Sequence, residues 1–158
     1  MIQRLQSIFL LLASGAIASL FSPIMALGKV VHGQAVAPSP LADGLFTISD
    51  DMSLSVLAGI AAGVFFAAIF LYKKRSFQAT ITQIGNFLSG SLLVYGYYLF
   101  SKAAPSVLAA QISETAQASE VGYGFGIGAP ILAMVLSLLA IRFIKKDEAI
   151  VRSADRLR

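Results

Sequence analysis

Four long apolar runs, with almost every charged residue confined to the segments between them, constrain this chain more than any other feature. The runs cover about residues 8–27, 54–72, 81–100 and 123–144. Each is close to the roughly 20 residues that an α-helix needs to cross about 30 Å of hydrocarbon. Arg142, in the last turn of the fourth run, is their one charged residue. The pattern predicts an all-α, polytopic membrane protein whose four transmembrane helices form a single domain over residues 1–158, a four-helix bundle.

The composition excludes several classes of function. Only 13% of the 158 residues are charged, against roughly 25% in a soluble domain. The chain has no cysteine, which excludes disulfides, thiol catalysis and cysteine-based metal sites, and its one histidine, His32, excludes a His-pair site. We therefore expect no cofactor and no metal. The net charge of +4 is interpreted as loop charge that sets orientation, not as a nucleic-acid surface.

Orientation follows from the basic residues of the connecting segments. One side holds the N-terminus, the link between the second and third runs and the C-terminal tail, with ten Lys and Arg residues. The other side holds only Lys29 and Lys102. Since cytoplasmic segments are rich in Lys and Arg, the first side is predicted to be cytoplasmic, with both termini inside. Alternatively, Arg4 and the apolar run that follows it could form a signal peptide that is later cleaved off. The run is longer than the apolar part of a signal peptide usually is, so we expect a retained span.

Two segments are predicted to lie outside the membrane. Residues 28–52 contain turn-forming Gly and Pro and one strand-like stretch, Leu45–Ile48. Residues 101–121 contain Pro105, a favourable first helical position, so a short surface helix is expected over Ser106–Ala118. Ser49 or Asp50 is expected to cap the second span. An aromatic belt is predicted at the membrane boundaries, formed by Tyr72, Tyr95, Tyr97, Tyr98, Tyr123, Phe125 and Phe143.

Small and polar residues within the runs predict helix packing. Gly59 and Gly63 form a G-x-x-x-G pair, and two further pairs, Gly15 with Ser19 and Gly85 with Ser89, have the same spacing, which lets helices approach closely. Two interpretations are open: these residues pack the four helices of one chain against one another, or they form a surface through which two chains dimerise. Gln83 and Asn86 in the third run are expected to form interhelical hydrogen bonds. A transport path would need more polar groups and an ionisable one at mid-depth.

The segment Val121-Gly122-Tyr123-Gly124 invites comparison with a potassium-channel filter, in which backbone carbonyls coordinate the ion. Glu120 precedes it where such a filter has a hydroxyl residue, and the fourth run already begins at Tyr123, which leaves no return segment. We therefore interpret these glycines as close packing at a helix entry. No Ser/His/Asp set, carboxylate pair or phosphate loop is found, so an enzyme is not expected.

The cytoplasmic tail, residues 145–158, is the most informative polar stretch. It is predicted to continue the fourth span as a short amphipathic helix with one apolar stripe. Two functions remain open for it: binding to anionic headgroups and docking to a partner protein. The residues expected to make either contact are Lys145, Lys146, Val151, Arg152, Arg156, Leu157 and Arg158.

Three segments also resemble a known family. They are the start Met1-Ile-Gln-Arg-Leu-Gln, the stretch Arg75-Ser-Phe-Gln78, and the ending from Ile144 to Arg158. In these the chain resembles an uncharacterised family of small four-span inner-membrane proteins from Bacteroidota, labelled domain of unknown function 4293. The resemblance implies a bacterial inner membrane and a functional tail, and it carries over no catalytic or binding residue.

Two functions are therefore expected. The first is a non-enzymatic accessory or structural subunit of a larger inner-membrane complex that docks through its basic tail. Its partners would be membrane lipids and other integral membrane subunits, with neither nucleic acid nor a small-molecule substrate. The alternative is a small transporter or lipid-binding protein with its site near Gln83 and Asn86.

Overall fold

The computed structural model describes residues 2–30, 44–72, 74–111 and 121–155, and these residues are mostly helical. They contain four α-helices: α1 (Ile2–Ala18), α2 (Met52–Phe70), α3 (Arg75–Gln111) and α4 (Gly128–Asp155). They also contain three short strands: β1 (Gly28–Val30), β2 (Leu45–Phe46) and β3 (Val121–Tyr123). Short 3-10 turns join these elements at Ser19–Phe21, Pro23–Met25, Ile48–Asp50 and Phe125–Ile127.

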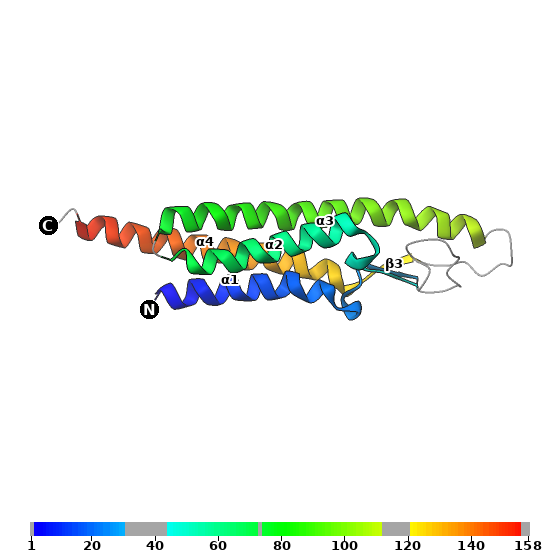
Figure 1. The fold of residues 1–158 in the computed structure, drawn as a ribbon, viewed down its shortest axis with the longest axis horizontal. Helices are drawn as coiled ribbons and strands as arrows, with labels where there is room; N and C mark the ends of the chain where they lie inside the picture. Colours follow the sequence, from blue (N-terminus) through cyan, green and yellow to red (C-terminus); the bar gives the residue numbers. More distant parts are fainter. Residues whose placement is uncertain (1, 31–43, 73, 112–120, 156–158) are drawn as a thin grey trace.

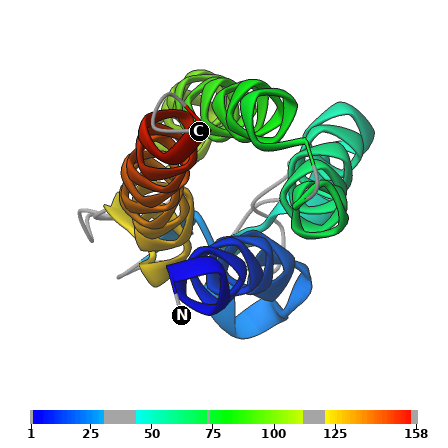
Figure 2. The ribbon, with the colours of Figure 1, turned by 90° about the vertical axis from the view of Figure 1, so that its left-hand side faces the viewer.

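The four helices lie side by side (Figures 1 and 2). Helix α1 packs against α2 and α4, and α3 packs against the same two helices. Both chain termini lie at one end of the molecule, here called the terminal end, and the strands lie at the other, the sheet end (Figure 1). The prediction of a mostly helical chain is confirmed, and the small sheet adds to it.

Side-chain size separates the inside of the helix assembly from its outside. Many of the buried helical residues are small, including Ala13, Ser14, Ala58, Ala61, Ser89, Ala133, Ser137 and Ala140. Large apolar residues lie exposed on the outward faces of all four helices, including Leu11, Leu12, Val56, Ile60, Phe87, Val94, Val135 and Leu138. The small interior residues let the helix backbones approach closely. The large exposed apolar residues form a surface of a kind that is rare on soluble monomers.

Helix α1 ends at Ala18, earlier than the predicted span end at residue 27. The reason is Pro23, because the residue before a proline is driven out of the helical region. Ser22 is indeed extended, with φ −83° and ψ 134°. Two 3-10 turns carry the chain on from Ala18 to Met25.

Helix α3 continues through Pro105 to Gln111, so the separate helix expected to begin at Pro105 is an extension of the third helix. The residues around the proline are mostly good helix formers, such as Ala, Lys and Leu. One proline removes a single backbone donor, which such a sequence tolerates here. The rest of the predicted stretch, residues 112–118, lies outside the described residues.

Helix α4 begins at Gly128, five residues after the predicted start of the fourth span, because Val121–Tyr123 pairs with β1. It then runs unbroken to Asp155, so the fourth span and the start of the tail form one helix. Among the described residues, two helical stretches are long and apolar enough to cross a membrane: Met52–Phe70 and Phe125–Val151. Leu5–Phe21 is a shorter apolar helix. These properties indicate membrane association.

Candidate functional site

The three strands form a small antiparallel sheet in the order β2-β1-β3, which joins the two segments expected outside the membrane. Gly28 lies opposite Phe46 on one side and Tyr123 on the other. Both aromatic rings contact Phe100 of α3, each with ring centroids 5.8 Å apart. A β-carbon on Gly28 would lie 2.1 Å from the Phe100 ring, so only glycine fits beneath the sheet at this position.

Glycines also fix where α4 enters. The N–H groups of Gly124 and Gly126 donate to the carbonyls of Leu27 and Ala26, at 3.0 and 2.9 Å. A β-carbon on Gly124 would lie 2.0 Å from the Ala26 carbonyl oxygen, and one on Gly126 would lie 2.2 Å from that of Met25. The filter-like segment is therefore a paired strand and a close backbone contact, in line with its interpretation as packing at a helix entry.

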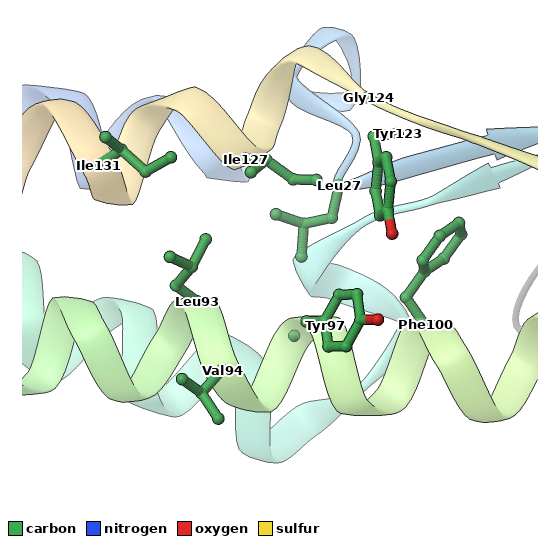
Figure 3. Close-up of a pocket in the computed structure, with 10 residues that line it drawn as sticks. Leu27, Leu93, Val94, Tyr97, Phe100, Tyr123, Gly124, Ile127 and Ile131 are labelled. Atoms are coloured by element: carbon green, nitrogen blue, oxygen red, sulfur yellow. The ribbon is translucent and has the colours of Figure 1, made fainter.

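A groove of about 610 Å³ lies between α3 and α4, next to the sheet. Its walls come from Leu93, Val94 and Tyr97 of α3, from Ile127 and Ile131 beside them, and from Tyr123 of β3 (Figure 3). Leu27, Gly96, Phe100 and Gly124 complete the lining. A β-carbon on Gly96 would approach Leu27 to 3.3 Å, so this glycine leaves room for Leu27 at the groove. The groove opens sideways, because Val94, Tyr97 and Tyr123 are largely exposed.

The polarity of the groove changes along its length. Nearly all of its lining is aliphatic or aromatic carbon, and the hydroxyls of Tyr97 and Tyr123 stand at the sheet end (Figure 3). The two tyrosine rings stack with centroids 6.4 Å apart. Apolar walls with a few convergent polar groups are typical of small-molecule sites, which usually have volumes of 300–1,000 Å³.

Next to the groove, side chains at the sheet end hold the helix ends. Asp51 caps α2 by accepting from the Leu54 N–H at 3.0 Å and from the Ser53 hydroxyl. These hydrogen bonds lower the pKa of Asp51. The predicted caps, Ser49 and Asp50, lie two residues and one residue before Asp51. The Asp50 carboxylate instead accepts from the Thr47 N–H and caps the preceding 3-10 turn. On α3, a hydrogen bond with Tyr98 raises the pKa of Lys102, whose ammonium lies 4.7 Å from the Tyr98 ring centre.

Hydrogen bonds between helices are made by a few short polar side chains. Asn86 of α3 donates to the Ser137 hydroxyl of α4 at 2.8 Å. Ser14 of α1 donates to the Ala62 carbonyl of α2 at 3.0 Å. Gln83, the other predicted hydrogen-bonding amide, lies on the exposed side of α3. The structure therefore does not bring Gln83 and Asn86 together at a cleft.

The predicted glycines of α1 and α2 face outward. Gly15, Gly59 and Gly63 are exposed, and a β-carbon on any of them would meet nothing within 4 Å. The Ser19 hydroxyl donates within its own chain segment, to the Ala16 carbonyl at 2.7 Å. The predicted Gly85 does lie at a helix contact: α2 and α3 approach closely there, and a β-carbon on Gly85 would lie 2.7 Å from the Phe65 ring.

The terminal end is polar inside. Gln6 of α1 and Gln78 of α3 are 2% and 1% exposed. Gln78 donates to the Ala68 carbonyl at 3.0 Å, while its Oε1 and the Nε2 of Gln6 have no partner among the described residues. The Arg75 Nε lies 3.0 Å from a carboxylate oxygen of Asp147, which joins the start of α3 to α4.

The C-terminal part of α4 projects past the other helices at the terminal end (Figure 1). Lys145, Lys146 and Val151 are exposed there, and Ile150 is 50% exposed. Arg152 lies in α4. Arg156, Leu157 and Arg158 lie outside the described residues, as does His32. Within the described ranges, no three His, Cys, Asp or Glu side chains form a group that could hold a metal ion.

Sequence reasoning missed the groove, because its walls come from three separate segments and from residues that also suit ordinary membrane helices. The available signal was the alternation of glycines from Gly122 to Gly128, which marked a close backbone contact without indicating the space beside it. Tyr97 and Tyr123 were predicted only as boundary aromatics.

The profile of a protein family described as a domain of unknown function (DUF4293) matches residues 2–157. This chain is a member of the DUF4293 family. No curated protein and no solved structure matches the chain. Membership therefore agrees with the resemblance in the three sequence segments and assigns no function to this DUF4293 protein.

Proposed function

We propose that this DUF4293 protein is a non-enzymatic protein of the bacterial inner membrane that crosses the bilayer four times with both termini in the cytoplasm. It acts as an accessory or structural subunit of a larger membrane complex. The projecting end of α4 docks on that complex. The exposed apolar side chains of this end are the observation on which the docking rests.

The distribution of side chains supports four spans. In the most apolar stretch of 18 residues, only 28% of α2 and 39% of α4 are buried. The core helix of a soluble protein would be mostly buried. Helix α2 has 19 residues without a charge, about 28 Å at 1.5 Å per residue, which matches the hydrocarbon thickness. Helices α1 and α3 also carry large apolar residues outward, which lipid would cover at no cost.

Charge supports the orientation. The terminal end carries Lys74, Arg75, Lys145 and Lys146, and the sheet end carries Lys29 and Lys102. Cytoplasmic segments carry an excess of Lys and Arg, which supports a terminal end on the cytoplasmic side. The sheet and the groove then lie on the outer side of the membrane.

The end of α4 extends past the other helices (Figure 1), and a side-chain contact holds the part of α4 from which it extends. Its base is joined to α3 by the Arg75–Asp147 ion pair. Beyond that point Ile150 and Val151 are 50% and 40% exposed, next to basic residues that favour an anionic surface. A partly apolar helix face with a basic rim can bind a partner helix in a groove.

Affinity purification from the native membrane in mild detergent tests the docking. Val151→Glu should release the co-purifying membrane proteins, because it places a charge on the apolar stripe. Ala149→Glu makes the same charge change on the other side of the exposed helix and should retain them. Recovery of the same proteins with Val151→Glu as with the wild type would contradict docking through this face.

A further inference from the structure

We propose that the groove between α3 and α4 binds an acyl chain of a membrane phospholipid, with the lipid's polar end at Tyr97 and Tyr123. The proposal rests on the membrane placement proposed above and is independent of the docking of α4. It assigns a ligand class and a direction of binding to a site lined almost entirely by carbon.

The groove has the polarity of one half of a lipid. Leu93, Val94 and Ile131 form its apolar part, and the hydroxyls of Tyr97 and Tyr123 stand at the sheet end (Figure 3). In the proposed orientation the apolar part lies toward the middle of the bilayer and the hydroxyls lie at the boundary. Tyrosine is enriched at this depth, because its ring is apolar and its hydroxyl can bond to polar lipid groups or water.

An acyl chain fits the lining of the groove along its length. The lining of α3 runs from Leu93 to Phe100, about 10 Å along the helix. An occupant meets carbon along this wall except at the hydroxyl of Tyr97, so a hydrocarbon chain leaves no polar group of the wall buried without a partner.

The absence of charge in the lining decides which part of the lipid is recognised. The ten lining residues include neither an acid nor a base, so the groove itself offers no ion pair to a headgroup. The tyrosine hydroxyls can donate to the ester carbonyls that link acyl chains to glycerol. We therefore expect binding through the chain and ester region, with little selectivity for headgroup charge.

The shape of the groove depends on the backbone, so the groove is preformed. Gly124 lines it and is held against Leu27 by the 3.0 Å hydrogen bond, and Leu27 is in turn seated over Gly96. Because an empty apolar groove would leave its walls without contacts, a lipid chain that enters the groove supplies the packing that these walls lack.

Native mass spectrometry tests this proposal. The full chain is reconstituted into vesicles of phosphatidylethanolamine and phosphatidylglycerol, recovered in mild detergent and measured for retained phospholipid. The wild type should retain one phospholipid of either headgroup. Ile131→Trp fills the groove and should lower the retained fraction severalfold, because the indole ring takes the space of the acyl chain. Tyr97→Phe should lower it less, because the ring remains.

Leu138→Trp is the matched control, since Leu138 is an outward residue of α4 at 53% exposure, close to the 46% of Ile131, and does not line the groove. It should retain lipid like the wild type. Wild-type protein that retains no phospholipid, or equal loss in Ile131→Trp and Leu138→Trp, would overturn the proposal. Flotation of each variant with its vesicles reports membrane insertion separately, so failure of the groove is distinguished from failure of the membrane placement.

Discussion

The sheet end and the terminal end are held together by different kinds of contact. At the sheet end, the backbone of residues 26–28 bonds to Phe46 on one side and to Gly124 and Gly126 on the other. At the terminal end, side chains make the contacts that stand out, such as the Arg75–Asp147 pair and the Gln78 amide. Backbone contacts fix geometry closely, whereas long side chains can rearrange. The difference suits a preformed groove at one end and an adaptable docking end at the other.

The largest expected effect breaks the backbone contact of the sheet end. Gly124→Ala should destabilise the protein by about 3 kcal/mol, because the new β-carbon would overlap the Ala26 carbonyl oxygen. Thermal unfolding in detergent, followed by circular dichroism, measures it. Gly128→Ala is the control: nothing lies within 4 Å of its β-carbon, so it should gain up to about 1 kcal/mol of helix propensity. Equal effects of the two changes would refute a backbone-fixed sheet end.

Asp51 tests the contribution of side chains at the sheet end. Asp51→Ala should cost about 1 kcal/mol through loss of the cap on α2. Because the hydrogen bonds from Ser53 and Leu54 lower the pKa of Asp51, the carboxylate stabilises the folded state fully above its ordinary value of 3.8. The contribution is lost as pH falls below 3.8 through the folded-state pKa. Unfolding of wild type and variant across this range measures the difference, and a difference that grows on acidification would have the wrong sign.

Asn86 and Gln83 test the middle of the helix assembly. Asn86→Leu removes the hydrogen bond to Ser137 and should cost about 0.6 kcal/mol, the usual size for such bonds in membranes. Gln83→Leu should cost nothing measurable or should stabilise slightly, because Gln83 is exposed on the proposed lipid-facing side. Parallel unfolding of the two variants decides it, and a larger loss for Gln83→Leu would argue against this placement.

The smallest expected effect belongs to the terminal end. A double-mutant cycle of Arg75→Ala and Asp147→Ala should give a coupling of about 0.5 kcal/mol that weakens with added salt. Both side chains keep some contact with solvent, at 24% and 14% exposure, so the pair is partly screened. A coupling as large as the Gly124→Ala loss would remove the contrast between the two ends.

The helical content and the approximate helix positions could be predicted from the sequence, because long apolar runs leave few alternatives. Helix ends were harder to predict. Pro23 ended α1 by forcing Ser22 out of the helix, while Pro105 did not end α3. The same residue type gave opposite results, since the outcome depends on neighbouring helix propensity and on tertiary contacts that a sequence window does not contain.

The candidate site was the least predictable part. The sheet pairs Gly28 with Tyr123, which are 95 residues apart, and Tyr123 of this pair lines the groove. Small residues were equally ambiguous: Gly59 and Gly63 face outward, whereas Gly85 receives the Phe65 ring. A small residue permits close approach, but its spacing does not say from which side a neighbour comes.

Labelling of single cysteines tests the central claim, that the helices cross the membrane with the sheet end outside. The chain has no native cysteine, so Ser49→Cys at the sheet end and Ser76→Cys at the terminal end are unique reporters, and both positions are exposed. In intact spheroplasts, a membrane-impermeant maleimide should label Ser49→Cys at once and Ser76→Cys only after lysis. Labelling of Ser76→Cys in intact spheroplasts, or equal labelling of the two variants, would contradict the account.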